Sequence, residues 1–226
     1  TDGSSKFMKG NQWGYFPAAA AAWRINEEPW MARTRNWLSN LKFRMSWGEV
    51  GNNRISSTLY QTTYSINTAK TYGVGDVANN YYSPSNSQMP NPHLKWETTI
   101  TRNLGLDFGL FNEKLNGTVE YYWDTAKDLL ITRSIVAPGY TSTVQNTAQT
   151  SNKGVEITLN GSLVRRRNFQ LDANFNIGFN HNAVDKIANG QSSLSFNSGW
   201  AGTDSKGQDD YRIIKGQPVG LVYGWV

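Results

Sequence analysis

A strict two-residue alternation over one long segment constrains the fold of this chain more than any other feature. From Leu94 to Leu110, mostly apolar residues occupy the even positions and polar or small residues occupy the odd ones. The even set is Leu94, Trp96, Thr98, Ile100, Arg102, Leu104, Leu106, Phe108 and Leu110. Successive side chains of a β-strand point to opposite faces, so only an extended strand separates the two sets.

Other segments repeat this alternation and are joined in pairs. The turns expected at Phe111–Lys114 and Val164–Asn168 each connect two such segments, which predicts two β-hairpins. The expected strands are residues 13–25, 41–48, 94–110, 115–124, 155–163, 169–180 and, as a weaker seventh candidate, Arg212–Val226.

The connections between these strands fall into two lengths. The hairpin turns are short, whereas Gly51–Pro92, Arg133–Asn152 and His181–Tyr211 are long and rich in Gly, Asn, Ser, Thr and Tyr. Asn26–Asn40 is an exception, because Glu27–Met31 within it is expected to form a helical turn. Alternating short and long connections are typical of a meander with tight turns at one end and elaborated loops at the other.

Composition excludes several classes of protein. The 226 residues include no Cys, which rules out a disulfide scaffold, a thiolate metal site and a cysteine nucleophile. Aromatic residues make up 13% of the chain and charged residues 17%, a mixture associated with strands and turns. No segment approaches the ~18 apolar residues of a membrane-spanning helix. The net charge of +5 is dispersed apart from Arg165–Arg167, so no nucleic-acid partner is expected.

Alternation by itself fits both a soluble β-sandwich and a transmembrane β-barrel. Strand length favours the barrel, because Leu94–Leu110 is about three times as long as the usual strand of ~5–6 residues, and a tilted membrane strand needs about 9–11. Trp and Tyr near strand ends on the apolar face fit interfacial girdles, and charges on the polar face fit a water-filled lumen. Those charged residues are Lys42, Arg44, Lys95, Glu97, Asp107, Glu120, Asp124, Glu156 and Asp172.

Arg102 carries a charge on the apolar face of this long strand. A cation at the midplane of a membrane barrel costs about 2–4 kcal/mol, but near an interface only about 0–1 kcal/mol. Arg102 precedes the turn at Phe111 by about ten residues, which is the length of a membrane crossing. We therefore expect Arg102 at the far membrane interface, where its side chain reaches anionic lipid headgroups.

Six groups of short strings occur in one order along nearly the whole chain. They are Asp2-Gly3-Ser4-Ser5-Lys6-Phe7 with Trp13-Gly14-Tyr15-Phe16-Pro17; Trp37-Leu38-Ser39-Asn40-Leu41-Lys42; Asn91-Pro92-His93-Leu94-Lys95-Trp96-Glu97; Asn103-Leu104-Gly105-Leu106-Asp107-Phe108-Gly109; Asn152-Lys153-Gly154-Val155-Glu156; and Lys215-Gly216-Gln217-Pro218-Val219-Gly220. In this order they resemble the SusC/RagA-like TonB-dependent outer-membrane transporters. His93 stands where that family usually has an acidic residue.

The resemblance implies an all-β chain: an antiparallel transmembrane β-barrel segment that supplies about seven strands of a large, roughly 22-stranded barrel. Residues 1–226 would then be a partial TonB-dependent receptor β-barrel domain from the later part of the barrel. The plug domain, the remaining strands and the TonB-contacting segment are expected outside this chain. Thr1–Ser5 lacks the regions of a signal peptide, so any such peptide is expected to be removed or to lie outside the chain.

The resemblance also implies a function and a location. The function is TonB-dependent import of oligosaccharides or peptides through the bacterial outer membrane, together with a SusD-like surface lipoprotein. The long loops would be extracellular, and the outer surface would contact outer-membrane lipid. No enzyme activity, cofactor or metal is expected, because His93 and His181 are isolated and Asp204, Asp209 and Asp210 lack EF-hand spacing.

Aromatic residues of the long loops are the candidate ligand-binding residues, namely Tyr81, Tyr82, Tyr140 and Trp200. An aromatic face can stack on a sugar ring or pack against a peptide, but such residues also pack loops together or form the outer girdle. One alternative function is a soluble β-sandwich carbohydrate-binding module that uses Tyr140 and Trp200 as stacking platforms. A passive structural or enzymatic barrel is a third.

Overall fold

The computed structural model describes residues 1–74, 77–188, 191–196 and 211–222, and only the backbone of residues 67–83 within these ranges and of Phe196. Within this part of the chain, no helix has the length and apolarity needed to cross a membrane. The elements are β1 (Asp2–Gly3), β2 (Trp13–Gly14), β3 (Ala18–Arg24), the 3-10 helices η1 (Ile25–Glu27) and η2 (Pro29–Thr34), β4 (Leu38–Asn52), β5 (Tyr64–Val74), β6 (Val77–Pro84), β7 (Gln88–Met89), β8 (Glu97–Leu110), β9 (Leu115–Ala137), β10 (Tyr140–Arg166), β11 (Phe169–Lys186), β12 (Ser193–Phe196), β13 (Tyr211–Ile214) and β14 (Leu221–Val222).

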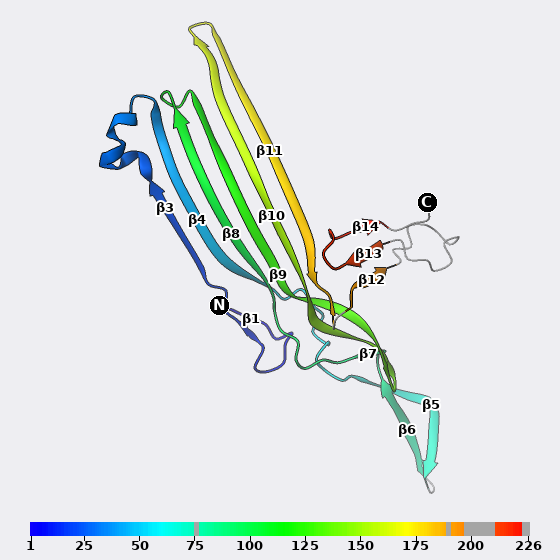
Figure 1. Ribbon diagram of the computed structural model, residues 1–226. Coiled ribbons are helices and arrows are strands. Elements are labelled where there is room, and N and C mark those ends of the chain that lie inside the picture. Colours follow the sequence, from blue (N-terminus) through cyan, green and yellow to red (C-terminus); the bar gives the residue numbers. More distant parts are fainter. Residues whose placement is uncertain (75–76, 189–190, 197–210, 223–226) are drawn as a thin grey trace. The chain divides into compact units, whose positions relative to one another are not determined.

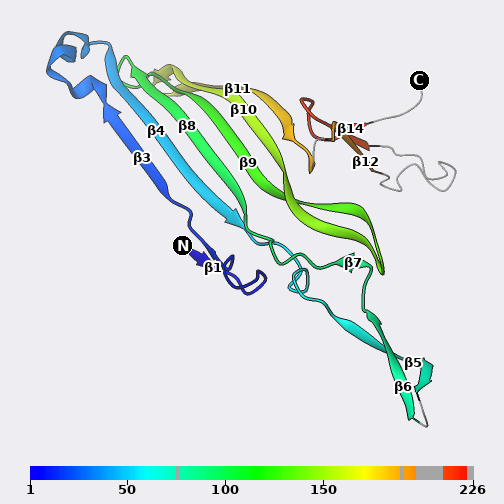
Figure 2. The same ribbon diagram turned by 60° about the horizontal axis from the view of Figure 1, so that its bottom comes forward.

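The main sheet is a meander of long strands. Its order is β11-β10-β9-β8-β4-β3, and the short strand β7 pairs in parallel with β10 as a seventh member. Figures 1 and 2 show the six long strands side by side in this order. The sheet does not close: β3 and β11 form its two edges and have no second neighbour among the described strands. The predicted all-β barrel-type sheet of about seven strands is confirmed, as an open segment of such a barrel.

Both predicted hairpins are present. β8 and β9 are joined by Phe111–Lys114, in which Phe111, Asn112 and Glu113 all have left-handed φ angles of 53°, 55° and 63°. The amide of Phe111 donates a hydrogen bond to the Trp37 carbonyl at 2.7 Å, which fixes the start of this turn. β10 and β11 form the second hairpin, with a register shift between Ser162 and Val164. The helical turn expected after β3 is also present, as η1 and η2.

The prediction of a long loop at Arg133–Asn152 is wrong. β9 continues to Ala137 and β10 begins at Tyr140, so a two-residue turn replaces the loop. Gly139, with φ of 79°, supplies the left-handed conformation that this tight turn needs. Thr and Val residues flank the turn and favour extended structure even though apolar and polar positions do not alternate there.

The other long connections also contain strands. Gly51–Pro92 holds the β5–β6 hairpin and β7, and β11 continues five residues beyond His181 to Lys186. The weaker candidate strand at Arg212–Val226 does not join the main sheet. Its described part forms β13 and β14, which pair with β12 in a separate three-stranded sheet.

The chain forms two compact units, through both of which β4, β8, β9 and β10 run. The first, the loop unit, comprises residues 1–16, 51–98 and 127–148; the second, the sheet unit, comprises residues 17–50, 99–126 and 149–226. Five whole strands, β1, β2, β5, β6 and β7, lie in the loop unit, and they include the β1–β2 pair and the β5–β6 hairpin.

The loop unit has its own hydrophobic core, formed by Phe7, Leu94, Trp96 and Val144. The Trp96 ring lies 5.4 Å from that of Phe7 and 5.5 Å from that of Phe16, measured between centroids. The alternation had placed Leu94 and Trp96 on the apolar face of the long strand, and this prediction is wrong. β8 begins only at Glu97, because the turn at Asn91 precedes it and directs Leu94 and Trp96 into the core.

Candidate functional site on the polar face of the sheet

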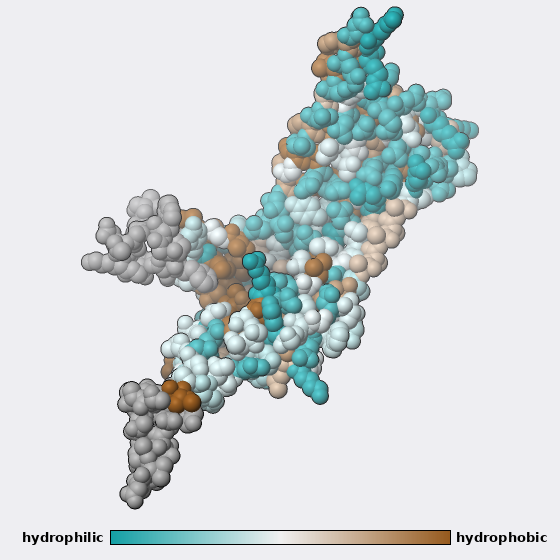
Figure 3. Space-filling model, turned by 180° about the vertical axis from the view of Figure 1, so that it is seen from behind, coloured by the Kyte–Doolittle hydropathy of each residue, from teal (hydrophilic) through white to brown (hydrophobic). Residues whose placement is uncertain are grey.

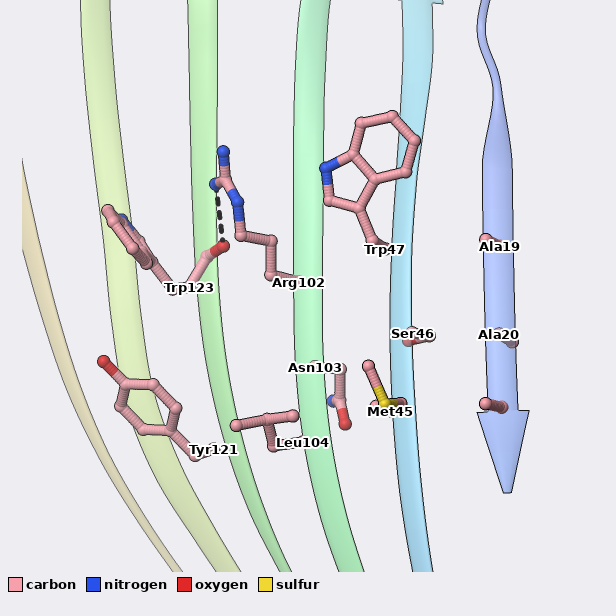
Figure 4. Close-up of a pocket in the computed structure, with 11 residues that line it drawn as sticks. Ala19, Ala20, Met45, Ser46, Trp47, Arg102, Asn103, Leu104, Tyr121 and Trp123 are labelled. Carbon is pink, nitrogen blue, oxygen red and sulfur yellow. Dashed lines mark hydrogen bonds between the residues drawn. The ribbon is translucent and has the colours of Figure 1, made fainter. Parts of the chain in front are cut away.

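The sheet unit has two chemically different faces. On one face, Met45, Leu104, Tyr121 and Trp123 are between 43% and 51% exposed, and Figure 4 shows them on neighbouring strands on the same side of the sheet. Figure 3 shows the molecule from behind, where hydrophilic residues cover the long strands. The predicted separation of an apolar from a polar face is thus present across β4, β8 and β9.

An ionic cluster centred on Arg44 occupies the polar face. The guanidinium of Arg44 on β4 donates two hydrogen bonds to the Asp107 carboxylate on β8, both at 2.8 Å. It also donates to Oε1 of Glu120 on β9 at 2.6 Å, and the Thr118 hydroxyl donates to Asp107 at 3.1 Å. Two carboxylates share one cation, so the cluster carries a net negative charge. The bidentate pair joins β4 to β8, and the bond to Glu120 adds β9.

Gly105 makes room for this cluster. A Cβ atom at position 105 would lie 2.9 Å from Nη2 and 3.0 Å from Cζ of Arg44, so the guanidinium lies directly against the β8 backbone. This contact gives the string Asn103–Gly109 a physical meaning: Gly105 seats the guanidinium and Asp107 binds it.

A second glycine of the polar face accommodates an aromatic ring. A Cβ atom on Gly154 of β10 would lie 2.5 Å from the hydroxyl oxygen and 2.6 Å from Cζ of Tyr122, so the ring of this β9 residue covers the glycine. The Tyr122 hydroxyl donates to Oδ1 of Asn180 on β11 at 2.8 Å. Tyr122 therefore ties β9 to β11 across the intervening strand.

Of the predicted ligand-binding residues, Tyr81, Tyr82 and Tyr140 all lie in the loop unit. Tyr81 and Tyr82 belong to β6, where their backbones pair with Asn67 and Ile66 of β5. Tyr140 is the half-buried first residue of β10. Trp200 lies outside the described residues.

The loop unit brings the start of β10 close to the segment that follows β6. The amide of Thr141 donates to the Ser87 carbonyl at 2.7 Å, and a Cβ atom on Gly139 would lie 3.6 Å from Cγ of Pro84. Tyr140 is therefore near the end of the strand that carries Tyr81 and Tyr82, although far from it in sequence.

The described residues contain no group of three or more His, Asp or Glu side chains arranged to hold a metal ion. His93 is exposed after the Asn91 turn, and His181 is exposed within β11 rather than in the loop-like context expected for it. Asp204, Asp209 and Asp210 lie outside the described residues.

Sequence reasoning placed Arg44, Asp107 and Glu120 on the polar face but did not join them into a cluster. Alternation gives the face of each residue, whereas contact also requires the register between strands that are up to 76 positions apart. One signal was available in the sequence: opposite charges lie on the same face of the predicted strands, and Gly105 lies on that face two residues before Asp107.

A long-stranded antiparallel meander with one exposed apolar face and one charged face defines the class of β-barrel membrane proteins. Residues 1–223 match the family model described as "TonB dependent receptor-like, beta-barrel". The chain belongs to this family, whose members are outer-membrane transporters and receptors, and the predicted resemblance is confirmed.

Three similar proteins illustrate the match. The TonB-dependent receptor SusC of Bacteroides thetaiotaomicron is 37% identical over 198 residues, which cover 85% of this chain and 19% of SusC. The TonB-dependent receptor P39 of Formosa agariphila is 31% identical over 229 residues, covering 99% of this chain and 20% of P39. A solved structure of the RagAB peptide importer in the open-open state has a TM-score of 0.78 and 25% identity, covering 96% of this chain and 22% of that chain. The chain thus spans about a fifth of the length of these relatives.

Proposed function

We propose that this chain is part of the barrel wall of a TonB-dependent importer that carries oligosaccharides or peptides across the bacterial outer membrane. The match to the receptor barrel family over residues 1–223 carries this proposal. SusC and the RagAB peptide importer are among the similar proteins, and both the glycan and the peptide cargo are therefore retained.

The proposed arrangement extends to the rest of the protein. Residues 1–226 form a partial β-barrel domain, and the plug domain, the remaining strands and the segment that contacts TonB belong to other parts of the polypeptide. The relatives are about five times longer than the aligned region, which supports this division. A SusD-like surface lipoprotein is the proposed partner at the extracellular side.

The polar face supports a role as a lumen wall. Arg44, Asp107 and Glu120 on this face engage one another, so they present hydrogen-bonding groups that are fixed in place. The β-sandwich alternative requires a second layer over the apolar face. In the described residues Leu104 and Trp123 are 46% and 47% exposed, whereas the core of a sandwich would bury such side chains.

Tyr140 is the proposed cargo-contacting residue of the described side chains, with Tyr81, Tyr82 and Trp200 as further candidates. An aromatic contact of this kind contributes ~0.5–1.5 kcal/mol beyond its buried area, equivalent to about a two- to tenfold change in affinity.

Uptake by the full-length protein tests this function. Cells that lack their own copy are complemented with wild-type protein, and uptake of labelled oligosaccharides and peptides is measured with and without TonB. Uptake of one cargo class should require both the protein and TonB; equal uptake without TonB would contradict the proposal. Tyr140→Ala should raise the half-saturation concentration about two- to tenfold, whereas Tyr140→Phe, which keeps the ring, should not. An unchanged Tyr140→Ala variant would remove Tyr140 from the cargo site and leave the transport proposal intact.

A further inference from the structure

An apolar groove opens on the exposed apolar face of the sheet unit, across β3, β4, β8 and β9 (Figure 4). Its volume is about 400 Å³, within the size range of small-molecule binding sites. Large side chains of Trp47, Leu104, Tyr121 and Trp123 border it, and each of these is 39% to 47% exposed. The groove is therefore formed by side chains that a lipid-facing surface would normally pack against acyl chains.

The groove is open because of the alanine run in β3. Ala19 pairs with Trp47 of β4, and Ala21 pairs with Met45. Alanine is depleted in strands, and its methyl group leaves the space beside the larger neighbours unfilled. The result is a hollow along β3 instead of a continuous layer of large apolar side chains.

Arg102 places a cation at the border of this groove. Its guanidinium carbon lies 4.9 Å from the centroid of the Trp123 ring. Nη1 donates to the Trp123 carbonyl at 3.4 Å (Figure 4). It also donates to the Thr125 hydroxyl at 3.3 Å. Both of these acceptors are neutral, and no carboxylate of the described residues pairs with Arg102. The stacked guanidinium thus keeps an uncompensated positive charge beside an apolar hollow.

Arg102 and Trp123 also lie at one end of the groove. In Figure 4 they stand with Trp47 above Leu104 and Tyr121, toward the end of the strands that is remote from the Phe111–Lys114 turn. A ligand that fits this arrangement has one anionic end and one apolar end. It lies with the anionic end at the level of the Trp residues, which favour the membrane interface.

We propose that the groove binds a phosphorylated glycolipid of the outer leaflet, with a phosphate on Arg102 and an acyl chain along Leu104, Tyr121 and the alanine run. The planar fork of N–H donors matches phosphate oxygens, and weak hydration of the guanidinium favours such a pair at the interface. The choice of the outer leaflet rests on the proposed function, because it requires the Phe111–Lys114 turn to be periplasmic.

Lipid titration of the full-length protein tests the site. The purified, delipidated transporter is titrated with diphosphoryl lipid A and with its dephosphorylated form, and bound lipid is counted by native mass spectrometry. Wild-type protein should bind the phosphorylated form about tenfold more tightly, since hydrogen bonds to charged groups contribute at least that factor. Arg102→Gln should abolish this preference, and Arg102→Lys should retain most of it. Arg167→Gln, at an exposed arginine of the β10–β11 turn, is the charge-matched control and should leave binding unchanged.

A second variant tests the acyl part of the site independently of charge. Ala19→Trp should fill the hollow beside Trp47 and weaken binding of both lipid forms. Assembly of each variant is checked by its heat-dependent mobility, so loss of binding is scored only for folded protein. Equal binding by wild type and Arg102→Gln would overturn the proposal, as would unchanged binding by Ala19→Trp. A third result would also overturn the proposal: the protein is a dimer, and Ala19→Trp dissociates it while lipid binding persists. The occupant of the groove would then be a second copy of the protein.

Discussion

At the scale of single residues, glycine determines where charged and aromatic groups can lie against the sheet. Gly105 and Gly154 each face a large side chain from a neighbouring strand, Arg44 in one case and Tyr122 in the other. Side chains that lie flat against a strand leave more of the polar face open than side chains that stand upright. The same contacts join adjacent strands, so the two glycines affect both the shape of the polar face and the stability of the sheet.

A methyl group at position 105 should loosen the Arg44 cluster. In Gly105→Ala the new Cβ would lie 2.9 Å from Nη2 of Arg44, so the guanidinium must shift away from Asp107 and Glu120. We expect a loss of about 1–2 kcal/mol, because charge-assisted hydrogen bonds are weakened without being abolished. The measurement is the temperature at which the full-length barrel loses its compact mobility in gel electrophoresis.

Gly178→Ala provides the matched control. A Cβ atom there would meet Cγ of Glu156 at 3.6 Å, an ordinary van der Waals distance. Its transition temperature should stay near the wild-type value. If both variants shift the transition temperature equally, the change comes from the effect of glycine replacement on the backbone and not from the contact between Gly105 and Arg44.

At the scale of elements, one end of the sheet has only compact connections, whereas the other end has both the two-residue β9–β10 turn and a long connection. The turns after β8 and β10 are short, and η1 and η2 connect β3 to β4 at that same end of the meander. The connection from β4 to β8 contains β5, β6 and β7, and it belongs largely to the loop unit. Barrels of the outer membrane place short turns in the periplasm and longer segments outside the cell.

Cysteine labelling in a full-length background without other accessible cysteines tests this orientation. Val136, near the β9–β10 turn, is fully exposed, and Lys114 is exposed at the β8–β9 turn. Val136→Cys should react with an impermeant maleimide on intact cells, whereas Lys114→Cys should react only after the outer membrane is opened. The reverse pattern would invert the proposed topology and place Arg102 in the inner leaflet.

Sequence alternation predicted the paired strands where apolar and polar residues alternate, and it failed where they do not. β8 and β9 follow the alternation because Leu104 and Tyr121 lie on one face and Asp107 and Glu120 on the other. In residues 133–152 apolar and polar positions do not alternate, so the period-two signal is absent although the strands continue. Trp96 fits the alternation but lies in the hydrophobic core, because alternation does not distinguish an apolar residue of a core from an apolar residue on an exposed face.

The candidate site was predictable only in part for a related reason. Face assignment required the order of residues along one strand, whereas the Arg44 cluster depends on the alignment of three strands. The position of Tyr140 depends on Gly139 and on the hydrogen bond from Thr141 to Ser87, neither of which alternation encodes. The stacking of Arg102 on Trp123 could not be predicted from alternation either, although this contact confirms the expected position of Arg102 on the apolar face.

At the scale of the whole molecule, the described sheet is an open surface with two unpaired edges, β3 and β11. Backbone N–H and C=O groups at such edges find no water within a bilayer, so they require further strands. Barrel diameter grows with strand number, and about seven strands cannot surround a plug-sized lumen. The sheet is therefore expected to depend on the rest of its polypeptide for stable insertion.

Expression of residues 1–226 alone tests this dependence. The fragment should give no heat-modifiable, protease-resistant species in outer membranes, whereas the full-length protein expressed in the same cells should give one. The measurement is gel mobility with and without heating after protease treatment of isolated membranes. A folded and resistant fragment would show that these strands close into a small barrel by themselves.

The core of the loop unit sets a condition on the order of folding. Phe7 packs against Trp96 and shares a cluster with Val144, so this core joins residues that are far apart in the chain. Contacts of such long sequence separation form slowly, because loop-closure entropy is lost before the contact is gained. This core therefore stays incomplete until the chain has emerged past Val144, and until then it exposes apolar surface of the kind that promotes aggregation.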